Sequence, residues 1–167
     1  MAVSVRLARI SDASAVASLT GQLGYDVESS ALAGRLSKLL ERPDQHVVIA
    51  ELEGRPVGWV HAAIWEDIES EPFVVIGGPV VDRYHRGQGV GRVLMQQAEK
   101  WALEQGCSIV RVWSSSVRTE AHRFYERLGY RNIKTQHSFA KSLNPDRQDD
   151  VNRFVPRVRA RAENQDV

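Results

Sequence analysis

The hydrophobic pattern of the first forty residues predicts one strand followed by two helices. Residues 3–8 alternate between apolar and other side chains, which is typical of a strand. Ser11 and Asp12 supply capping oxygens for a helix that continues through Leu23. A second helix is predicted after it, because leucines recur there at helical spacing until shortly before Pro43.

The middle of the chain is rich in predicted strands. Residues 46–52 and 55–64 flank the turn signal Glu53–Gly54, and together they predict a hairpin. Residues 73–81 form an apolar run that is typical of a buried strand. The glycine pair at 77–78 interrupts this run and predicts a bulge or a close backbone approach.

The second half of the chain predicts two more helices and further strands. Apolar residues at helical spacing predict helices over residues 90–106 and 118–129, with a strand over residues 108–113 between them. Residues 130–143 are expected to supply one or two final strands. The order predicts a mixed α/β fold in which the 90–106 helix links two buried strands by a right-handed crossover.

The length and composition predict one globular domain. The chain has 167 residues, of which 43% are hydrophobic and 26% charged. The periodic pattern ends near residue 143, so we expect the domain to span residues 3–143. Residues 144–167 form a basic tail, for which both a solvated, flexible segment and a dimer contact remain open.

Charge and cysteine content argue against several classes of protein. The 22 basic and 21 acidic residues nearly cancel, which argues against a nucleic-acid or membrane partner. The single cysteine, Cys107, forms no intrachain disulfide and is too few for a thiolate metal site. Residues 1–10 also lack the apolar stretch of a signal peptide. We therefore expect a reducing, cytoplasmic setting.

The stretch HRGQGVGRVL, residues 85–94, places three glycines in five residues at the start of a predicted helix. The first N–H groups of a helix have no intrahelical partner and carry partial positive charge. Gly87, Gly89 and Gly91 leave room for an anion to reach those groups. Arg86 adds a charged fork of donors, so we predict a turn that binds a diphosphate.

Two common nucleotide motifs do not match this stretch. A dinucleotide fold needs G-x-G-x-x-G after a first strand and an acidic residue further on, where this chain has Cys107 and Ser108. A P-loop needs a lysine that is missing here. The stretch instead resembles the pyrophosphate motif of the GCN5-related N-acetyltransferase (GNAT) superfamily, Q/R-x-x-G-x-G/A, with Arg86, Gly89 and Gly91 in register.

The resemblance covers nearly the whole predicted domain. The sequence AHRFYERLGY, residues 121–130, is similar to the second motif of the family, A-x-x-h-Y-e-k-L-G-F/Y. The resemblance implies a GNAT-type fold, with a central, mostly antiparallel sheet that splays between its fourth and fifth strands and helices on its flanks. It also implies an acetyl-CoA-dependent N-acetyltransferase with no metal, and it leaves a homodimer open.

The resemblance also assigns roles to individual residues. It implies that Tyr125 is the general acid for the leaving thiolate and that Glu71 and Glu69 are the candidate bases, although by periodicity Tyr125 also fits an ordinary core aromatic. Where many members of the family have Asn, this chain has Arg118, for which contact with the coenzyme or the acceptor is expected. The implied coenzyme contacts are Val80, Val81, Arg86, Gly87, Gln88, Gly89, Val90, Gly91 and Arg92.

Acidic and aromatic residues occupy the segments that line the acceptor groove in the family. They are Asp26, Glu28, Glu66, Asp67, Glu69 and Glu71, with Trp59 and Trp65. Such a groove favours the primary amine of a small cationic molecule or a peptide, whereas the same carboxylates equally fit a solvated loop. Two alternatives stay open: a non-catalytic coenzyme A-binding module, and nucleic-acid binding through Arg83, Arg86 and the tail.

Overall fold

The structure is a computed structural model that describes residues 2–25, 27–146 and 151. The chain divides into two units, residues 1–133 and 134–167, and the α-helices and β-strands of the described residues all belong to the first. They are β1 (Ser4–Leu7), α1 (Ala13–Gly21), α2 (Ser29–Leu40), β2 (Gln45–Leu52), β3 (Arg55–Trp65), β4 (Phe73–Ile76), β5 (Val80–Val81), α3 (Val90–Glu104), β6 (Val110–Val112) and α4 (Thr119–Arg127). Two short 3₁₀ turns, η1 (Ile10–Asp12) and η2 (Arg83–His85), precede α1 and α3.

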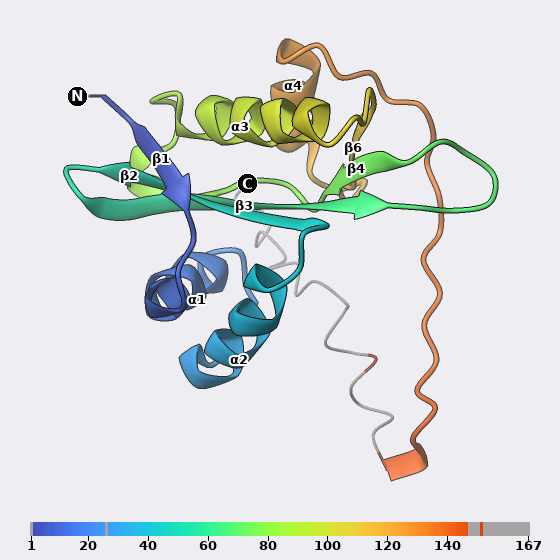
Figure 1. Ribbon diagram of the computed structural model, residues 1–167, viewed down its shortest axis with the longest axis horizontal. Coiled ribbons are helices and arrows are strands. Elements are labelled where there is room, and N and C mark those ends of the chain that lie inside the picture. Colours follow the sequence, from blue (N-terminus) through green and yellow to red (C-terminus); the bar gives the residue numbers. More distant parts are fainter. Residues whose placement is uncertain (1, 26, 147–150, 152–167) are drawn as a thin grey trace, which may run out of the picture. The chain divides into compact units, whose positions relative to one another are not determined.

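The strands form one mixed sheet between two layers of helices. The order is β1-β2-β3-β4-β6, and β5 pairs with β3. All pairs are antiparallel except β4 with β6, which are parallel and are connected through α3. Helices α3 and α4 lie on one face of the sheet, and α1 and α2 lie on the other (Figure 1). The predicted mixed α/β fold is therefore confirmed.

Alternate residues of the central strands feed two separate cores. In β2, Val48 and Ala50 are buried with α3, whereas Val47 and Ile49 are buried with α1 and α2. Side chains on successive residues of a strand point to opposite faces, so one strand can serve both cores. The larger core is the one under α3, which contributes Leu94, Met95 and Ala98 among others.

The sheet parts at the glycine pair that interrupts residues 73–81. Strands β4 and β6 stay paired up to Ile76 and Val112, and β5 then pairs with β3 alone. Gly78 takes a φ of +104°, a conformation that only glycine adopts readily, so the chain can change direction there. The predicted interruption is confirmed, and it lies where β5 departs from β6.

The end of the domain differs from the sequence prediction. Residues 130–143 were expected to supply one or two strands, and this prediction is wrong, because no strand follows β6 among the described residues. Ile133, Phe139 and Leu143 are exposed among the described residues, whereas a strand in a sheet would bury one of its faces. Most of the predicted basic tail, residues 144–167, lies outside the described residues.

The start of α1 also differs from the prediction. Asp12 was expected to cap α1, but its side chain makes no such bond. The carboxylate instead binds the guanidinium of Arg6 at 2.7 and 2.8 Å and accepts a hydrogen bond from the Arg9 N–H. The hydrogen bond from Arg6 holds the pKa of this buried carboxyl below its usual value. Asp12 therefore ties β1 to the first turn rather than capping the helix.

Candidate active site

The turn before α3 leaves backbone donors free for a ligand. Gly87 and Gly89 take φ values of +76° and +86°, which glycine adopts without strain. Gly89 is the N-cap of α3, and the first helical bond runs from the Val93 N–H to the Gly89 carbonyl. A Ser or Asp at this position would use its side chain to satisfy the free N–H groups. Glycine leaves them for an outside acceptor such as a phosphate oxygen.

Three polar side chains surround these donors. Arg86 and Arg92 are exposed, and Arg86 Nε lies 3.4 Å from the Val81 carbonyl oxygen. Gln88 donates from Nε2 to the Tyr84 carbonyl at 3.1 Å, which fixes the turn internally. Two cations beside free N–H groups at the positive end of a helix form an arrangement suited to a diphosphate.

Helix α4 places two successive aromatic residues against glycines of this region. A Cβ on Gly91 would lie 3.1 Å from the Phe124 ring, so Gly91 permits the close approach of α3 and α4. A Cβ on Gly78 would lie 2.7 Å from the Tyr125 hydroxyl oxygen. One turn of α4 therefore contacts both the first turn of α3 and the break between β4 and β5.

Tyr125 lies in an aromatic cluster. Its ring packs edge to face with Phe124 and with Tyr130, at centroid distances of 5.3 and 6.1 Å. The Tyr130 hydroxyl donates to Glu99 Oε1 at 2.7 Å. Burial raises the pKa of Tyr125 above its usual value, and the positive charge of Arg118 acts in the opposite sense. The phenol is therefore protonated at neutral pH.

The two candidate bases lie apart from Tyr125. Glu69 and Glu71 are exposed residues of the loop before β4, whereas Gly78, which contacts the Tyr125 hydroxyl, follows β4. The four residues of β4 alone separate these positions by about 13 Å, at about 3.3 Å per residue. The structure thus gathers Tyr125, Arg118 and the glycine turn, and it does not gather Glu69 or Glu71 with them.

The residues expected in an acceptor groove fall into different environments. The Trp59 side chain packs against the core under α1 and α2, and its indole nitrogen is buried. Trp65 is half-exposed and packs edge to face against Trp113 at 5.6 Å. Glu28, Glu66 and Asp67 are exposed, and Asp26 lies outside the described residues.

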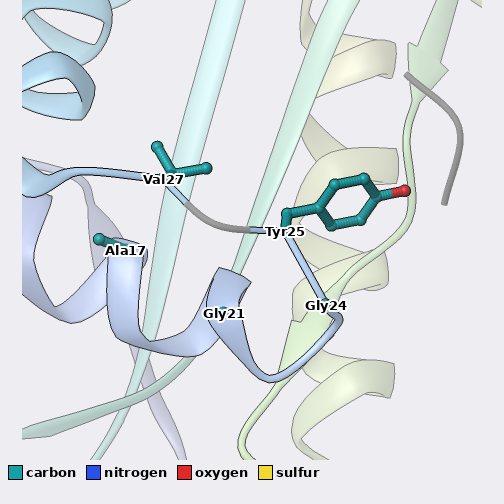
Figure 2. A pocket seen from close by; sticks show the side chains of 5 residues that line it. All are labelled: Ala17, Gly21, Gly24, Tyr25 and Val27. Atoms are coloured by element: carbon teal, nitrogen blue, oxygen red, sulfur yellow. The ribbon is translucent and has the colours of Figure 1, made fainter. Parts of the chain in front are cut away.

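A separate pocket lies at the end of α1. It has a volume of about 280 Å³ and is lined by Ala17, Gly21, Gly24, Tyr25 and Val27. Figure 2 shows the half-buried Tyr25 ring pointing away from Ala17 and Val27, on the segment that leads to α2. The sequence motifs gave no reason to select Tyr25, because it belongs to no recognisable spacing.

Comparison with known proteins identifies the family. The acetyltransferase (GNAT) family matches residues 15–130, more than half of the chain. The chain therefore belongs to the acetyltransferase (GNAT) family.

Related sequences agree with this assignment. An uncharacterized N-acetyltransferase of Methanocaldococcus jannaschii is 33% identical over 55% of this chain, which spans only 42% of that protein. An uncharacterized N-acetyltransferase of Chlorobaculum tepidum is 29% identical over 80% of this chain and 78% of its own length. An N-acetylaspartate synthetase of Danio rerio is 32% identical over 51% of this chain and 29% of its own length.

Solved structures show the same fold. The aminoglycoside acetyltransferase AAC(6')-Iy, in complex with a bisubstrate analogue, matches with a TM-score of 0.77 over 85% of this chain and 99% of its own, at 20% identity. A glucosamine-6-phosphate N-acetyltransferase of Arabidopsis thaliana matches with a TM-score of 0.73 over 85% of this chain and all of its own, at 23% identity. The fold is thus the mixed α/β fold of GNAT acetyltransferases.

Groups of metal ligands and membrane-spanning helices are both absent from the described part of the chain. Within the described part of the chain, His, Cys, Asp and Glu side chains nowhere form a group of three or more that could hold a metal ion. Among the same residues, no helix is both long and apolar enough to span a membrane.

Proposed function

We propose that the protein is an acetyl-CoA-dependent N-acetyltransferase that transfers the acetyl group directly to a primary amine. The observation that carries the proposal is the placement of α4. Its Tyr125 hydroxyl lies against Gly78, where β5 departs from β6, and its Phe124 packs on Gly91 at the start of α3. Through the adjacent residues Phe124 and Tyr125, helix α4 thereby connects a proton donor, the Tyr125 hydroxyl, to the N-terminus of α3, which is suited to bind an anion.

The turn from Arg86 to Arg92 binds the pyrophosphate of the coenzyme. Free N–H groups in the first turn of α3 and the guanidinium groups of Arg86 and Arg92 support this role. The strand of Val80 and Val81, β5, offers the backbone groups of its free edge to the pantetheine arm, because β5 pairs with β3 on one side only. The aminoglycoside N-acetyltransferase AAC(6')-Iy, which has the same fold, was solved in complex with CoA, and this supports coenzyme A as the ligand.

Tyr125 protonates the leaving thiolate. As the amine attacks the thioester carbonyl, a C–N bond forms, the C–S bond breaks, and the sulfur takes the phenolic proton. A pKa raised by burial keeps that proton on Tyr125 at neutral pH until the thiolate develops. The nearby charge of Arg118 stabilises the phenolate that transfer leaves behind.

The proton of the attacking amine passes to water in this proposal, and the Tyr125 phenolate takes a proton back from water, so that the protons balance over one turnover. Glu69 and Glu71 are separated by β4 from the end of the strand that Tyr125 contacts, so neither supports direct proton abstraction. Their carboxylates, with Glu66 and Asp67, instead favour a cationic acceptor at longer range, either a small molecule or a peptide. The cytoplasmic setting and the homodimer stay predictions.

The test is a free-thiol release assay with acetyl-CoA and a panel of polyamines, aminoglycosides, amino acids and peptides. We expect amine-dependent thiol release together with a mass increase of one acetyl group on the accepted amine. Coenzyme A binding measured by calorimetry, without thiol release for any amine, would show a binding module instead. Steep salt-dependent DNA binding that coenzyme A displaces would support the nucleic-acid alternative.

A further inference from the structure

The segment 82–89, which leads into α3 and which we call the coenzyme turn from here on, contains a carboxylate that the proposed ligand would repel. Asp82 directly precedes η2 and stands four residues before Arg86. A carboxylate close to a diphosphate is unfavourable unless its charge is engaged by other groups. The hydrogen bonds of Asp82 show how this charge is used.

Three donors occupy the Asp82 carboxylate. Oδ1 accepts from the Tyr84 N–H at 2.9 Å and contacts His85 Nδ1 at 2.8 Å. Oδ2 accepts from Gln22 Nε2 at 2.8 Å. The hydrogen bond from Gln22 is the main reason that the pKa of Asp82 lies below its usual value, with His85 and Tyr84 contributing.

Gln22 uses both ends of its amide on this turn. Its Oε1 accepts from the Arg83 N–H at 2.9 Å while its Nε2 donates to Asp82. Among the described residues, Gln22 is the one residue of another element whose side chain hydrogen-bonds to the segment 82–89. A backbone bond also holds this segment, from the Asp82 N–H to the Val57 carbonyl. An amide with both ends satisfied fixes position and orientation together.

Gln22 is also the C-cap residue of α1, beside the pocket of Figure 2. Gly21 precedes it and Gly24 and Tyr25 follow, and all three line that pocket. The two bonds made by Gln22 therefore connect the pocket at the end of α1 to the turn at the start of α3, across 60 residues of sequence.

We propose that Gln22 is a positioning residue that, through Asp82 and Arg83, holds the glycine turn in the geometry that binds the coenzyme diphosphate. The inference rests on the proposed function, because it assumes that this turn binds coenzyme A. Without the Gln22 amide, η2 loses its link to α1, and the N–H groups of α3 no longer converge with Arg86. Gln22 does not touch the reacting atoms.

A charge exchange between Gln22 and Asp82 tests the proposal. Gln22→Glu keeps an acceptor for the Arg83 N–H but faces the Asp82 carboxylate with a second one, at a site where the two groups now stand 2.8 Å apart. Asp82→Asn keeps the acceptor for the Tyr84 N–H but turns an amide donor toward Gln22 Nε2. The double variant restores the bond between the two side chains with its polarity reversed, since the amide introduced at position 82 can then donate to the carboxylate introduced at position 22, and it keeps the acceptors for the Arg83 and Tyr84 N–H groups.

Coenzyme A affinity by calorimetry is the readout, with the KM for acetyl-CoA and kcat beside it. We expect each single variant to weaken binding about tenfold and to raise KM more than it lowers kcat, and the double variant to return within about threefold of the parent. Gln45→Glu is the matched control, because Gln45 donates to Asp44 at the start of β2 as Gln22 donates to Asp82. Its coenzyme affinity should equal that of the parent.

The outcomes separate this inference from the proposed function. If the parent protein does not bind coenzyme A, the proposed function fails. If the parent binds and Gln22→Glu binds equally well, or the double variant is no better than the singles while its melting temperature matches the parent, Gln22 does not position the turn. Thermal unfolding of every variant distinguishes loss of the turn geometry from loss of the fold.

Discussion

The turn before α3 and the segment after α1 are linked by the side chain of Gln22, and they are built differently. The turn, residues 82–89, is fixed by glycines with positive φ, by internal hydrogen bonds and by Gln22. In the segment after α1, residues 22–25, the backbone bonds found among the described residues run from the N–H groups of residues 22–24 to carbonyls of the last turn of α1. Gly24 and Tyr25 of this segment line an open pocket of about 280 Å³. The coenzyme side is thus more constrained than the pocket side.

This difference would follow from two kinds of ligand, a diphosphate at the turn and an acceptor amine at the pocket. A diphosphate makes the same demand on every chain that binds it: free N–H groups, cations and room for an anion. Those demands are met by residues close together in sequence, so they appear as a motif. An acceptor amine differs between enzymes, and its contacts come from segments that are brought together only by the fold.

Gly89→Glu is expected to have the largest effect, and it tests the constrained side. A glutamate at a φ of +86° is strained and stands where the diphosphate is proposed to bind. We expect calorimetry to show coenzyme A affinity reduced at least about 100-fold. Gly34→Glu in α2 is the control, because a Cβ there meets nothing within 4 Å. Unchanged coenzyme A affinity in Gly89→Glu would contradict the proposal that this turn binds the diphosphate.

Gly78→Ala tests the contact between the sheet break and α4. The new Cβ would lie 2.7 Å from the Tyr125 hydroxyl at a φ of +104°, so the phenol must move. We expect kcat for thiol release to fall about tenfold or more. Gly77→Ala, where a Cβ meets nothing within 4 Å, should stay within about twofold. Equal activity in the two variants would show that the contact between Gly78 and the Tyr125 hydroxyl does not contribute to thiol release.

Tyr25→Ala tests whether the less constrained side, the pocket at the end of α1, binds the acceptor amine. Tyr25 lines the pocket at the end of α1. Among the described residues, the side-chain hydrogen bonds from this segment to the coenzyme turn are made by Gln22 and not by Tyr25. We expect steady-state kinetics to show the KM for the accepted amine raised about fivefold, with the KM for acetyl-CoA unchanged. A rise of both KM values by the same factor would mean that Tyr25 supports the fold instead of the acceptor.

The double variant Glu69→Gln, Glu71→Gln is expected to have the smallest effect. Both carboxylates are exposed and are separated by β4 from the strand end that Tyr125 contacts, so only long-range attraction of a cation is lost. We expect kcat to change by less than about twofold. A fall of about 100-fold in kcat, with a flattened pH–rate profile, would restore them as the general base.

Most of the fold could be predicted from the sequence because its patterns are local. The leucine spacing before Pro43 predicted α2, and the glycine pair at 77–78 predicted the break in the sheet. The strands expected in residues 130–143 were wrong, since a strand depends on a distant partner that an alternating pattern does not reveal. The cap predicted at Asp12 is wrong, because the partner of its carboxylate, Arg6, lies on β1 and the residue types at the helix start do not reveal that contact.

The residues of the candidate site also fall into two groups, those that the sequence could predict and those that only the structure reveals. The glycine turn and Tyr125 were recognisable because each belongs to a contiguous motif. Gln22 was not, because its bonds to Asp82 and Arg83 join residues 60 and 61 positions apart. Gly91 was expected to make room for the anion, whereas its contact with Phe124 shows that it also lets α3 and α4 approach.

The most direct test of the account compares Tyr125→Phe with Tyr130→Phe. Both changes remove one phenolic hydroxyl from the same aromatic cluster, but the Tyr130 hydroxyl donates a hydrogen bond to Glu99, whereas the Tyr125 hydroxyl lies against Gly78. At saturating acetyl-CoA, we predict that kcat for thiol release falls about 100-fold or more in Tyr125→Phe with KM unchanged, and by less than about threefold in Tyr130→Phe. Parent-like kcat in Tyr125→Phe for every accepted amine would contradict the account.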